Sequence, residues 1–316
     1  MSCYHPFAAI PDHPYAERGK KDYKLVGAYY PDLRIIYPNV VAVPCGKCIG
    51  CRLDYSRQWA DRMFLEMDHT KKALFVTLTY NDDNLPRADL TDYPTLRKED
   101  MQKFMKCIRG RDKFELNKTE LRFFGCGEYG SSTHRPHMHL ILFGTDLDDW
   151  QDKKPYKKNK LFQQLWTSEE FNDIWKKGYC ILAEASWETM AYTARYVVKK
   201  VYSDKLPWPG SEPEFTLMSR RPGIGAYYME EHIVDFENNC VGFRKGNKIS
   251  VPKYLLKKIE NVDPFMYNTL MEKRIKLAQD RELLKLQNTD LDYQQVLHVE
   301  ELKRLESVKK LERSEV

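Results

Sequence analysis

Two histidines separated by one residue stand within the apolar segment 135–144, which Pro136 opens and Gly144 closes. Proline is tolerated at the first position of a strand, and the segment has the length and composition of a buried strand. Successive side chains of a strand point to opposite faces, so His137 and His139 should lie side by side on one face. Such a pair can bind a metal ion, although a single histidine in an apolar segment is more often a core residue.

A carboxylate is expected close to this pair. Residues 121–129 are typical of a second strand, and the link to the histidine strand is about seven residues long, which fits a hairpin-type connection. The two strands are therefore predicted to be antiparallel neighbours. This arrangement brings Glu128 near His137 and His139.

A cysteine cluster lies nearer the N-terminus, where two residues separate Cys45 from Cys48 and two more separate Cys48 from Cys51. Thiols at this spacing can converge on one ion, and either Cys3 or His5 could supply a fourth ligand, with Cys3 favoured. Structural zinc is the preferred interpretation. An iron–sulfur cluster accepts the same spacing, and a loop with free thiols is the remaining alternative.

Two tyrosines four residues apart stand in a predicted helix over residues 186–201. Tyr192 and Tyr196 should share a helix face, and Lys199 and Lys200 follow about one turn later. Tyrosines of amphipathic helices usually fill a core. Near a histidine pair and a carboxylate, a functional role becomes the better interpretation.

The remaining patterns predict the elements that must position these residues. We expect helices over 52–68 and 96–109, strands over 73–80 and 178–185, a hairpin within 240–253 and a charged helical tail. Arg62 in the first helix is read as a phosphate contact or part of a solvated face. The expected division is an N-terminal arm with the cysteines (1–72), a core (73–205), an extension (206–262) and the tail (263–316).

Composition limits the classes of protein without choosing one. The 316 residues include 42% hydrophobic and 31% charged residues, and the net charge is +5. No segment is apolar enough to span a membrane. The start of the chain lacks the basic and apolar regions of a secretion signal, so the eight cysteines are expected to be reduced. The modest positive charge is compatible with a polyanionic partner.

The motifs together resemble those of the HUH endonuclease superfamily, and most closely the rolling-circle replication initiators of gokushovirus-type Microviridae, which are small single-stranded DNA phages. The resemblance rests on Phe75-Val76-Thr77-Leu78-Thr79, Gly127-Glu128-Tyr129-Gly130, the histidine pair, the tyrosine helix, the cysteine cluster with Cys3-Tyr4-His5-Pro6, and Ser219-Arg220-Arg221-Pro222-Gly223-Ile224-Gly225. It implies an α+β fold: an HUH nuclease core with a central antiparallel sheet (RRM/ferredoxin-like) and flanking helices, a Cys-rich N-terminal arm and a helical C-terminal tail.

The resemblance also implies an activity. His137, His139 and Glu128 would bind Mn²⁺ or Mg²⁺, and Tyr192 or Tyr196, assisted by Lys199, would attack DNA and form a covalent phosphotyrosine link. Two imidazoles and a carboxylate accept Mn²⁺ readily and Mg²⁺ less ideally. The residues expected to contact DNA are Arg195, Lys200, Arg220 and Arg221.

The implied partners are a single-stranded DNA origin and the replication machinery of a bacterial host, in whose cytoplasm the protein would act. A host helicase is expected, because the glycines of residues 242–248 have the wrong spacing for a P-loop. Two alternatives remain. The first is a zinc-stabilised, non-catalytic nucleic-acid-binding protein. The second is a relaxase or single-tyrosine transposase of the same superfamily, in which the second tyrosine would have no role.

Overall fold

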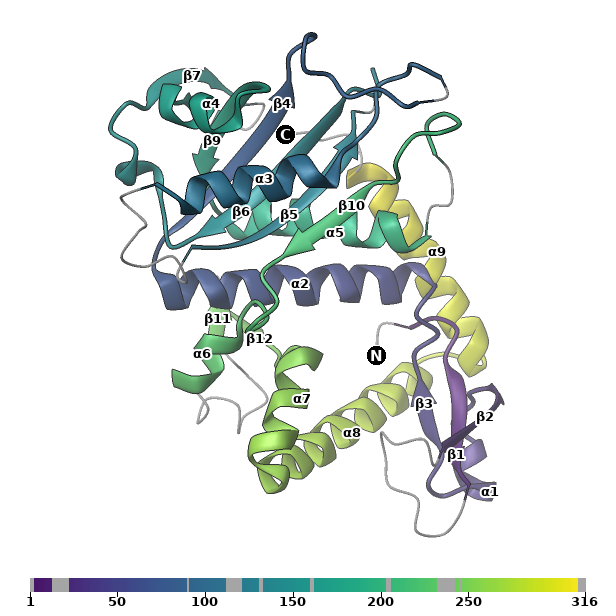
Figure 1. Cartoon of the computed structure of the whole chain (residues 1–316). Helices are drawn as coiled ribbons and strands as arrows, with labels where there is room; N and C mark the ends of the chain where they lie inside the picture. Colours follow the sequence, from purple (N-terminus) through teal and green to yellow (C-terminus); the bar gives the residue numbers. More distant parts are fainter. Residues whose placement is uncertain are drawn as a thin grey trace. The chain divides into compact units, whose positions relative to one another are not determined.

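The computed structural model describes residues 3–12, 23–89, 91–111, 121–130, 133–159, 162–202, 206–231, 242–244 and 246–311 (Figure 1). Of these, the side chains of residues 196–202, 242–244, 247 and 310–311 are not described. The chain divides into two compact units. One comprises residues 1–55 with 263–315, and the other comprises residues 56–262.

The second unit is built on a seven-stranded sheet in which every neighbouring pair of strands is antiparallel. In spatial order its strands are β10 (Phe215–Met218), β5 (Arg122–Tyr129), β6 (Pro136–Phe143), β4 (Ala73–Tyr80), β9 (Gly178–Glu184), β8 (Gln164–Thr167) and β7 (Lys154–Lys158). The predicted antiparallel pairing of the strand that carries Glu128 with the histidine strand is confirmed.

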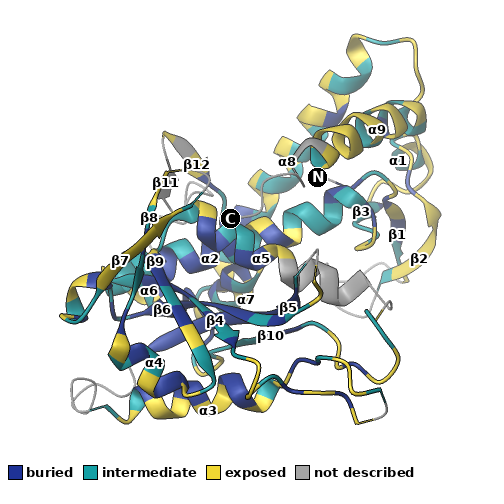
Figure 2. Cartoon of the chain, turned by 90° about the horizontal axis from the view of Figure 1, so that it is seen from above, coloured by how far each residue is buried: buried dark blue, intermediate teal, exposed yellow. Residues whose placement is uncertain are grey.

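Helices cover both faces of this sheet (Figure 1). On one face, α3 (Lys98–Arg109) and α4 (Glu169–Trp175) pack on Met138, Leu140 and Leu142 of β6. On the opposite face, the part of α2 (Ile49–Thr70) that follows Tyr55 and the helix α5 (Trp187–Tyr202) pack on Ile141 and Phe143. Figure 2 shows the difference between the central strand β5 in dark blue and the edge strand β7 in yellow.

Two glycines of β5 are required by this packing. Side chains at positions 125 and 127 would point toward α3, where a Cβ on Gly127 would lie 2.5 Å from the ring of Phe215 and one on Gly125 would lie 3.0 Å from the sulfur of Met101. Interiors packed at crystal-like density tolerate no such overlap. The glycines of this motif therefore let β10 and α3 approach the strand that carries Glu128.

The loop after β10, residues 219–225, is held by buried groups of the same unit. Arg122 forms a buried ion pair with Glu66 and donates to the carbonyl of Pro222, 2.8 Å away. Glu66 also accepts from the backbone N–H of Gly225, and the Tyr254 hydroxyl accepts from that of Gly223 at 3.1 Å. These glycine N–H groups are thus committed within the protein, and a phosphate approach to them, one interpretation of the motif, is wrong.

Arg62 differs from its predicted role for a related reason. Its side chain is buried, with the guanidinium carbon 4.0 Å from the ring centre of Trp59 and 3.9 Å from that of Tyr254. It also donates through Nε to the carbonyl of Ile224 at 3.0 Å. Arg62 is therefore part of the support for the loop and neither a solvated residue nor a phosphate contact.

The first unit combines both ends of the chain. A three-stranded sheet of β2 (Tyr23–Ala28), β1 (Phe7–Pro11) and β3 (Val41–Val43) is joined by α1 (Leu33–Ile36), α8 (Pro264–Gln287) and α9 (Tyr293–Leu311). The tail is thus two helices packed on the N-terminal sheet rather than one surface helix. Buried Glu282 of α8 accepts from Arg34 at 3.0 Å and from the Tyr29 hydroxyl at 3.3 Å.

The other predicted elements are confirmed with small shifts at their ends. The helix expected at 52–68 extends over Ile49–Thr70, and the expected hairpin consists of β11 (Gly242–Arg244) and β12 (Asn247–Ile249). The second unit also contains α6 (Ala226–Glu231), α7 (Lys253–Val262) and the short 3-10 helix Leu147–Asp149. None of the helices in the described part of the chain combines the length and hydropathy needed to cross a membrane.

Candidate active site

Strand register brings the predicted carboxylate and histidines together. In the β5–β6 pair, Glu128 lies directly opposite His137, and Cys126 lies opposite His139. Residues that face each other across an antiparallel pair project from the same face of the sheet, so the three side chains share the face covered by α5. The short link that follows Tyr129 fixes this register.

The three side chains meet at one oxygen atom. Oε1 of Glu128 lies 2.7 Å from Nε2 of His137 and 2.8 Å from Nε2 of His139. Glu128 and His139 are buried, and His137 is half-buried. All three potential ligand atoms lie within 4.8 Å of one another, which is close enough for one metal ion to contact them all. The donor set of two imidazoles and one carboxylate fits a divalent transition-metal ion.

The outer ring nitrogens of the histidines are also held. Nδ1 of His137 lies 3.1 Å from the carbonyl oxygen of Arg135, which can only accept, so this nitrogen carries the proton. Nδ1 of His139 lies 2.9 Å from the hydroxyl of Thr77, and the Phe75 ring stacks on the imidazole at 5.4 Å between centres. Contacts of this kind orient a metal-binding imidazole and select the nitrogen that faces the ion.

The charges of the group depend on these contacts. Burial alone would raise the pKa of Glu128, but hydrogen bonds from His137 and His139 outweigh it and lower the pKa to about 2. Burial would likewise lower the pKa of His137, but the hydrogen bond with Glu128 raises it above the ordinary value. For His139, burial prevails and lowers the pKa. The site thus keeps an ionised carboxylate between two imidazoles of different basicity.

Tyr192 of α5 reaches the same oxygen atom. Its hydroxyl donates to Oε1 of Glu128 at 3.2 Å, and its ring meets His139 edge-on with the centres 5.3 Å apart. Arg195 is exposed, and its guanidinium carbon lies 5.6 Å from the centre of the Tyr192 ring. Tyr196, Lys199 and Lys200 belong to the same helix, but their side chains lie outside the described residues.

The two arginines expected to contact DNA lie elsewhere on this unit. Arg220 and Arg221 are exposed on the loop after β10. Residue 218 of β10 pairs with Phe124, whereas Phe215 pairs with Gly127 next to Glu128, so the loop leaves the sheet at the end away from the histidine pair. The structure therefore does not bring Arg220 and Arg221 together with the residues around Glu128.

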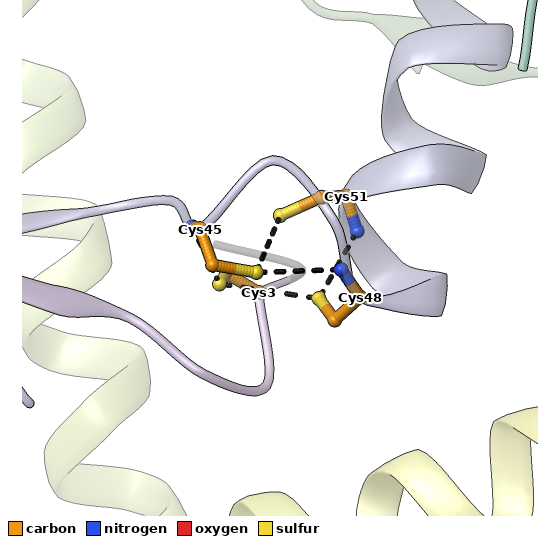
Figure 3. Close-up of side chains that lie close together, drawn as sticks. All are labelled: Cys3, Cys45, Cys48 and Cys51. Atoms are coloured by element: carbon orange, nitrogen blue, oxygen red, sulfur yellow. Dashed lines mark hydrogen bonds between the residues drawn. The ribbon is translucent and has the colours of Figure 1, made fainter. Parts of the chain in front are cut away.

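The four predicted cysteines converge in the first unit (Figure 3). Cys3 precedes β1, Cys45 follows β3, and Cys48 and Cys51 lie at the beginning of α2. The sulfur atoms of Cys45 and Cys51 are 4.0 Å apart, as are those of Cys48 and Cys3. His5, the alternative fourth ligand, instead places Nε2 2.7 Å from Oε2 of Glu301.

Backbone N–H groups point at the cysteine sulfurs. The N–H groups of residues 47 and 48 donate to the sulfur of Cys45 at 3.4 and 3.3 Å, and that of Cys45 donates to Cys3 at 3.2 Å. Burial raises the pKa of Cys3 to about 11 and also raises that of Cys51. At Cys45 burial acts in the same direction, but the backbone N–H donors outweigh it and lower the pKa.

Comparison with known proteins gives the family. Residues 73–201 match a family model described as Replication-associated protein ORF2. The chain is 36% identical over 245 residues to Replication-associated protein ORF2 of Spiroplasma virus 4, which covers 75% of this chain and 74% of that protein. It is 31% identical over 216 residues to Replication-associated protein VP4 of Bdellovibrio phage phiMH2K, with 67% and 66% covered.

A third relative, Replication-associated protein ORF4 of Chlamydia phage 1, is 26% identical over 245 residues, and the match spans 75% of this chain and 60% of that protein. No solved structure matches the chain significantly. The chain therefore belongs to the family of phage replication-associated proteins, as the resemblance of its motifs predicted.

Sequence reasoning missed the residues that hold the histidines in place. Thr77 and Phe75 lie on β4, which pairs with β6 so that Thr77 is opposite His139 and Thr79 is opposite His137. Their alternation with Val76 and Leu78 was the available signal. Apolar side chains at every second position indicate the covered face, and the hydroxyls at 77 and 79 then belong to the face of the histidines.

Proposed function

We propose that this protein is a rolling-circle replication initiator with an HUH nuclease core. It would cut single-stranded DNA at an origin in the cytoplasm of a bacterial host, hold the 5′ end as a phosphotyrosine, and later rejoin the strand. The observation that supports this proposal most directly is the meeting of Tyr192, His137 and His139 at one oxygen of Glu128. A potential nucleophile thus lies beside a set of metal ligands.

The proposed reaction is a transesterification. The phenolic oxygen of Tyr192 attacks the scissile phosphorus, the bond from phosphorus to the 3′ oxygen breaks, and this oxygen leaves as a hydroxyl after gaining a proton. A divalent ion at Glu128, His137 and His139 would withdraw charge from the non-bridging phosphate oxygens. A phenol has a pKa near about 10, so a nearby cation, for which we propose Lys199, would favour its ionised form.

Rejoining reverses the same steps. A 3′-hydroxyl attacks the phosphotyrosine, and the phenol leaves, so no nucleotide cofactor is needed. A second cut during this cycle needs a nucleophile that is not already esterified. We assign this role to Tyr196, one turn further along α5 from Tyr192. The exposed residues Arg195, Arg220 and Arg221, together with Lys200, would contact the DNA backbone.

The test is covalent capture of DNA. Purified protein is incubated with Mn²⁺ and a randomised pool of single-stranded 60-mers labelled at the 3′ end, and adducts are separated under denaturing conditions. We expect a labelled adduct whose nucleotide maps by mass spectrometry to Tyr192 or Tyr196. Each single Tyr→Phe variant should keep some adduct, whereas the double variant should form none.

Variants of the metal ligands provide the control. His137→Ala and His139→Ala should abolish the adduct while their thermal unfolding stays close to that of the wild type, because the site lies at one end of the sheet. Unchanged adduct formation by both variants would overturn the ligand assignment. DNA binding with no adduct from any sequence would favour the non-catalytic nucleic-acid-binding protein instead.

We further propose that Cys3, Cys45, Cys48 and Cys51 bind a structural zinc ion. Zinc–sulfur bonds of about 2.3 Å in a tetrahedron place the sulfurs about 3.8 Å apart, and the two measured distances are 4.0 Å. Elemental analysis of freshly purified protein should find one zinc per chain. Iron in its place would indicate the iron–sulfur alternative, and neither metal would refute the proposal.

A further inference from the structure

One cross-strand row continues the face of the candidate active site over four neighbouring strands. Glu128 of β5 pairs with His137 of β6, His137 with Thr79 of β4, and Thr79 with Tyr179 of β9. Paired residues in antiparallel strands project from the same face, so Tyr179 lies on the face of the histidine pair. With adjacent strands about 4.8 Å apart, the backbone of Tyr179 lies about 10 Å from that of His137.

This part of the face is open. α5 packs over β10, β5 and β6, which form the other half of the sheet. Beyond it Thr77, Thr79 and Ile181 are half-buried, and Tyr179 is 66% exposed. The hydroxyl of Thr79 donates to the carbonyl of Tyr179 at 3.0 Å, which adds a side-chain link to the strand pairing. A flat aromatic side chain is thus presented to solvent from a firmly paired strand.

We propose that the ring of Tyr179 stacks on an unpaired base of the single-stranded DNA, close to the phosphate held at the active site. This inference rests on the proposed function. A strand rises about 3.4 Å per nucleotide when stacked and up to about twice that when extended. The distance of about 10 Å therefore corresponds to one to three nucleotides from the scissile phosphate.

The chemistry of the row fits this occupant. A single strand that enters the metal site must lie with its backbone near the ligands, and its neighbouring bases need an apolar surface. Every base has a π-face, so stacking on an aromatic ring adds affinity with little dependence on sequence. Tyr179 would therefore hold the flanking nucleotide while other residues select the origin.

The test measures binding without cleavage. In a Tyr192→Phe, Tyr196→Phe background, the affinity for a fluorescein-labelled oligo-dT 20-mer is determined by anisotropy at fixed salt. We expect Tyr179→Ala to weaken binding about 5- to 100-fold, from the usual effect of removing one stacked base. Tyr179→Phe keeps the ring and should bind as the parent does.

A matched control is available on the same sheet. Tyr156 of β7 is similarly exposed, at 57%, but β7 is four strands away from β6. Tyr156→Ala should leave the affinity within about twofold of the parent. Parent-like binding by Tyr179→Ala refutes the stacking proposal, and so does a loss in Tyr179→Phe equal to that in Tyr179→Ala, because the hydroxyl would then be the group that matters.

The contact can also be located directly. Oligonucleotides that carry 5-iododeoxyuridine at single positions are irradiated with the same background protein, and we expect the crosslinked peptide to contain Tyr179. Crosslinks confined to other residues would refute the assignment. Covalent capture by the wild type, measured separately, distinguishes the two failures: an adduct without any effect of Tyr179 leaves the proposed function intact, whereas an effect of Tyr179 without any adduct does not.

Discussion

The hydroxyl of Thr77 is expected to set how tightly the histidine pair binds a divalent ion. It lies 2.9 Å from Nδ1 of His139, whose Nε2 faces Glu128. A neutral imidazole offers a lone pair at Nε2 only when Nδ1 carries the proton, and an oxygen acceptor at Nδ1 favours that form. Thr77→Val removes the acceptor and keeps the β-branched shape of the side chain.

The size of the effect follows from the burial of the site. Removing one partner of a buried hydrogen bond costs about 1–3 kcal/mol, which corresponds to roughly 5- to 150-fold in a binding constant. Loss of an outer partner of a metal-binding histidine typically weakens metal affinity about 10- to 100-fold. We therefore expect Thr77→Val to raise the Kd for Mn²⁺ by about 10- to 100-fold.

Mn²⁺ affinity is measured by electron paramagnetic resonance or calorimetry on the DNA-free protein, so the result does not depend on nicking. Thr77→Ser retains the hydroxyl and should bind Mn²⁺ within about threefold of the wild type, well inside the loss expected for valine. Equal Mn²⁺ affinity in the valine variant and the wild type would refute the argument. A serine variant as weak as the valine variant would show that shape, rather than the hydrogen bond, matters at this position.

Three further predictions concern the metal sites and the sheet. Cys48→Ser should lower the melting temperature in calorimetry and abolish zinc retention, because zinc–thiolate bonds contribute to folding, whereas Cys107→Ser, at an exposed cysteine of α3, should change neither. Mn²⁺ affinity should fall as the pH decreases through the raised pKa of His137, so the loss should begin above pH 6.5, the ordinary value, and calorimetric titrations across pH 5–9 would contradict this if affinity were flat above 6.5. Gly127→Ala places a Cβ 2.5 Å from the Phe215 ring and should destabilise the fold by about 1–3 kcal/mol in denaturant unfolding, while Gly130→Ala, whose Cβ would make only contacts of 3.6 Å or more, should not.

The sequence contained most of the local information about the site. The period of two in residues 136–143 placed His137 and His139 on one face, and a short link made the pairing with the strand of Glu128 the simplest solution. The spacing of Cys45, Cys48 and Cys51 predicted that their thiols converge. These inferences succeeded because they depend on strand geometry and on contacts between residues close in sequence, both of which follow from the pattern of side chains.

Only the tertiary structure decided the contacts between residues distant in sequence. Thr77 lies beside His139 because β4 inserts between β6 and β9, and Tyr192 reaches Glu128 because α5 packs across β5 and β6. Cys3 rather than His5 joins the cysteine cluster because His5 pairs with Glu301 of α9. The packing of whole elements determines such contacts, and local spacing cannot specify them, since many packings bury the same apolar residues equally well.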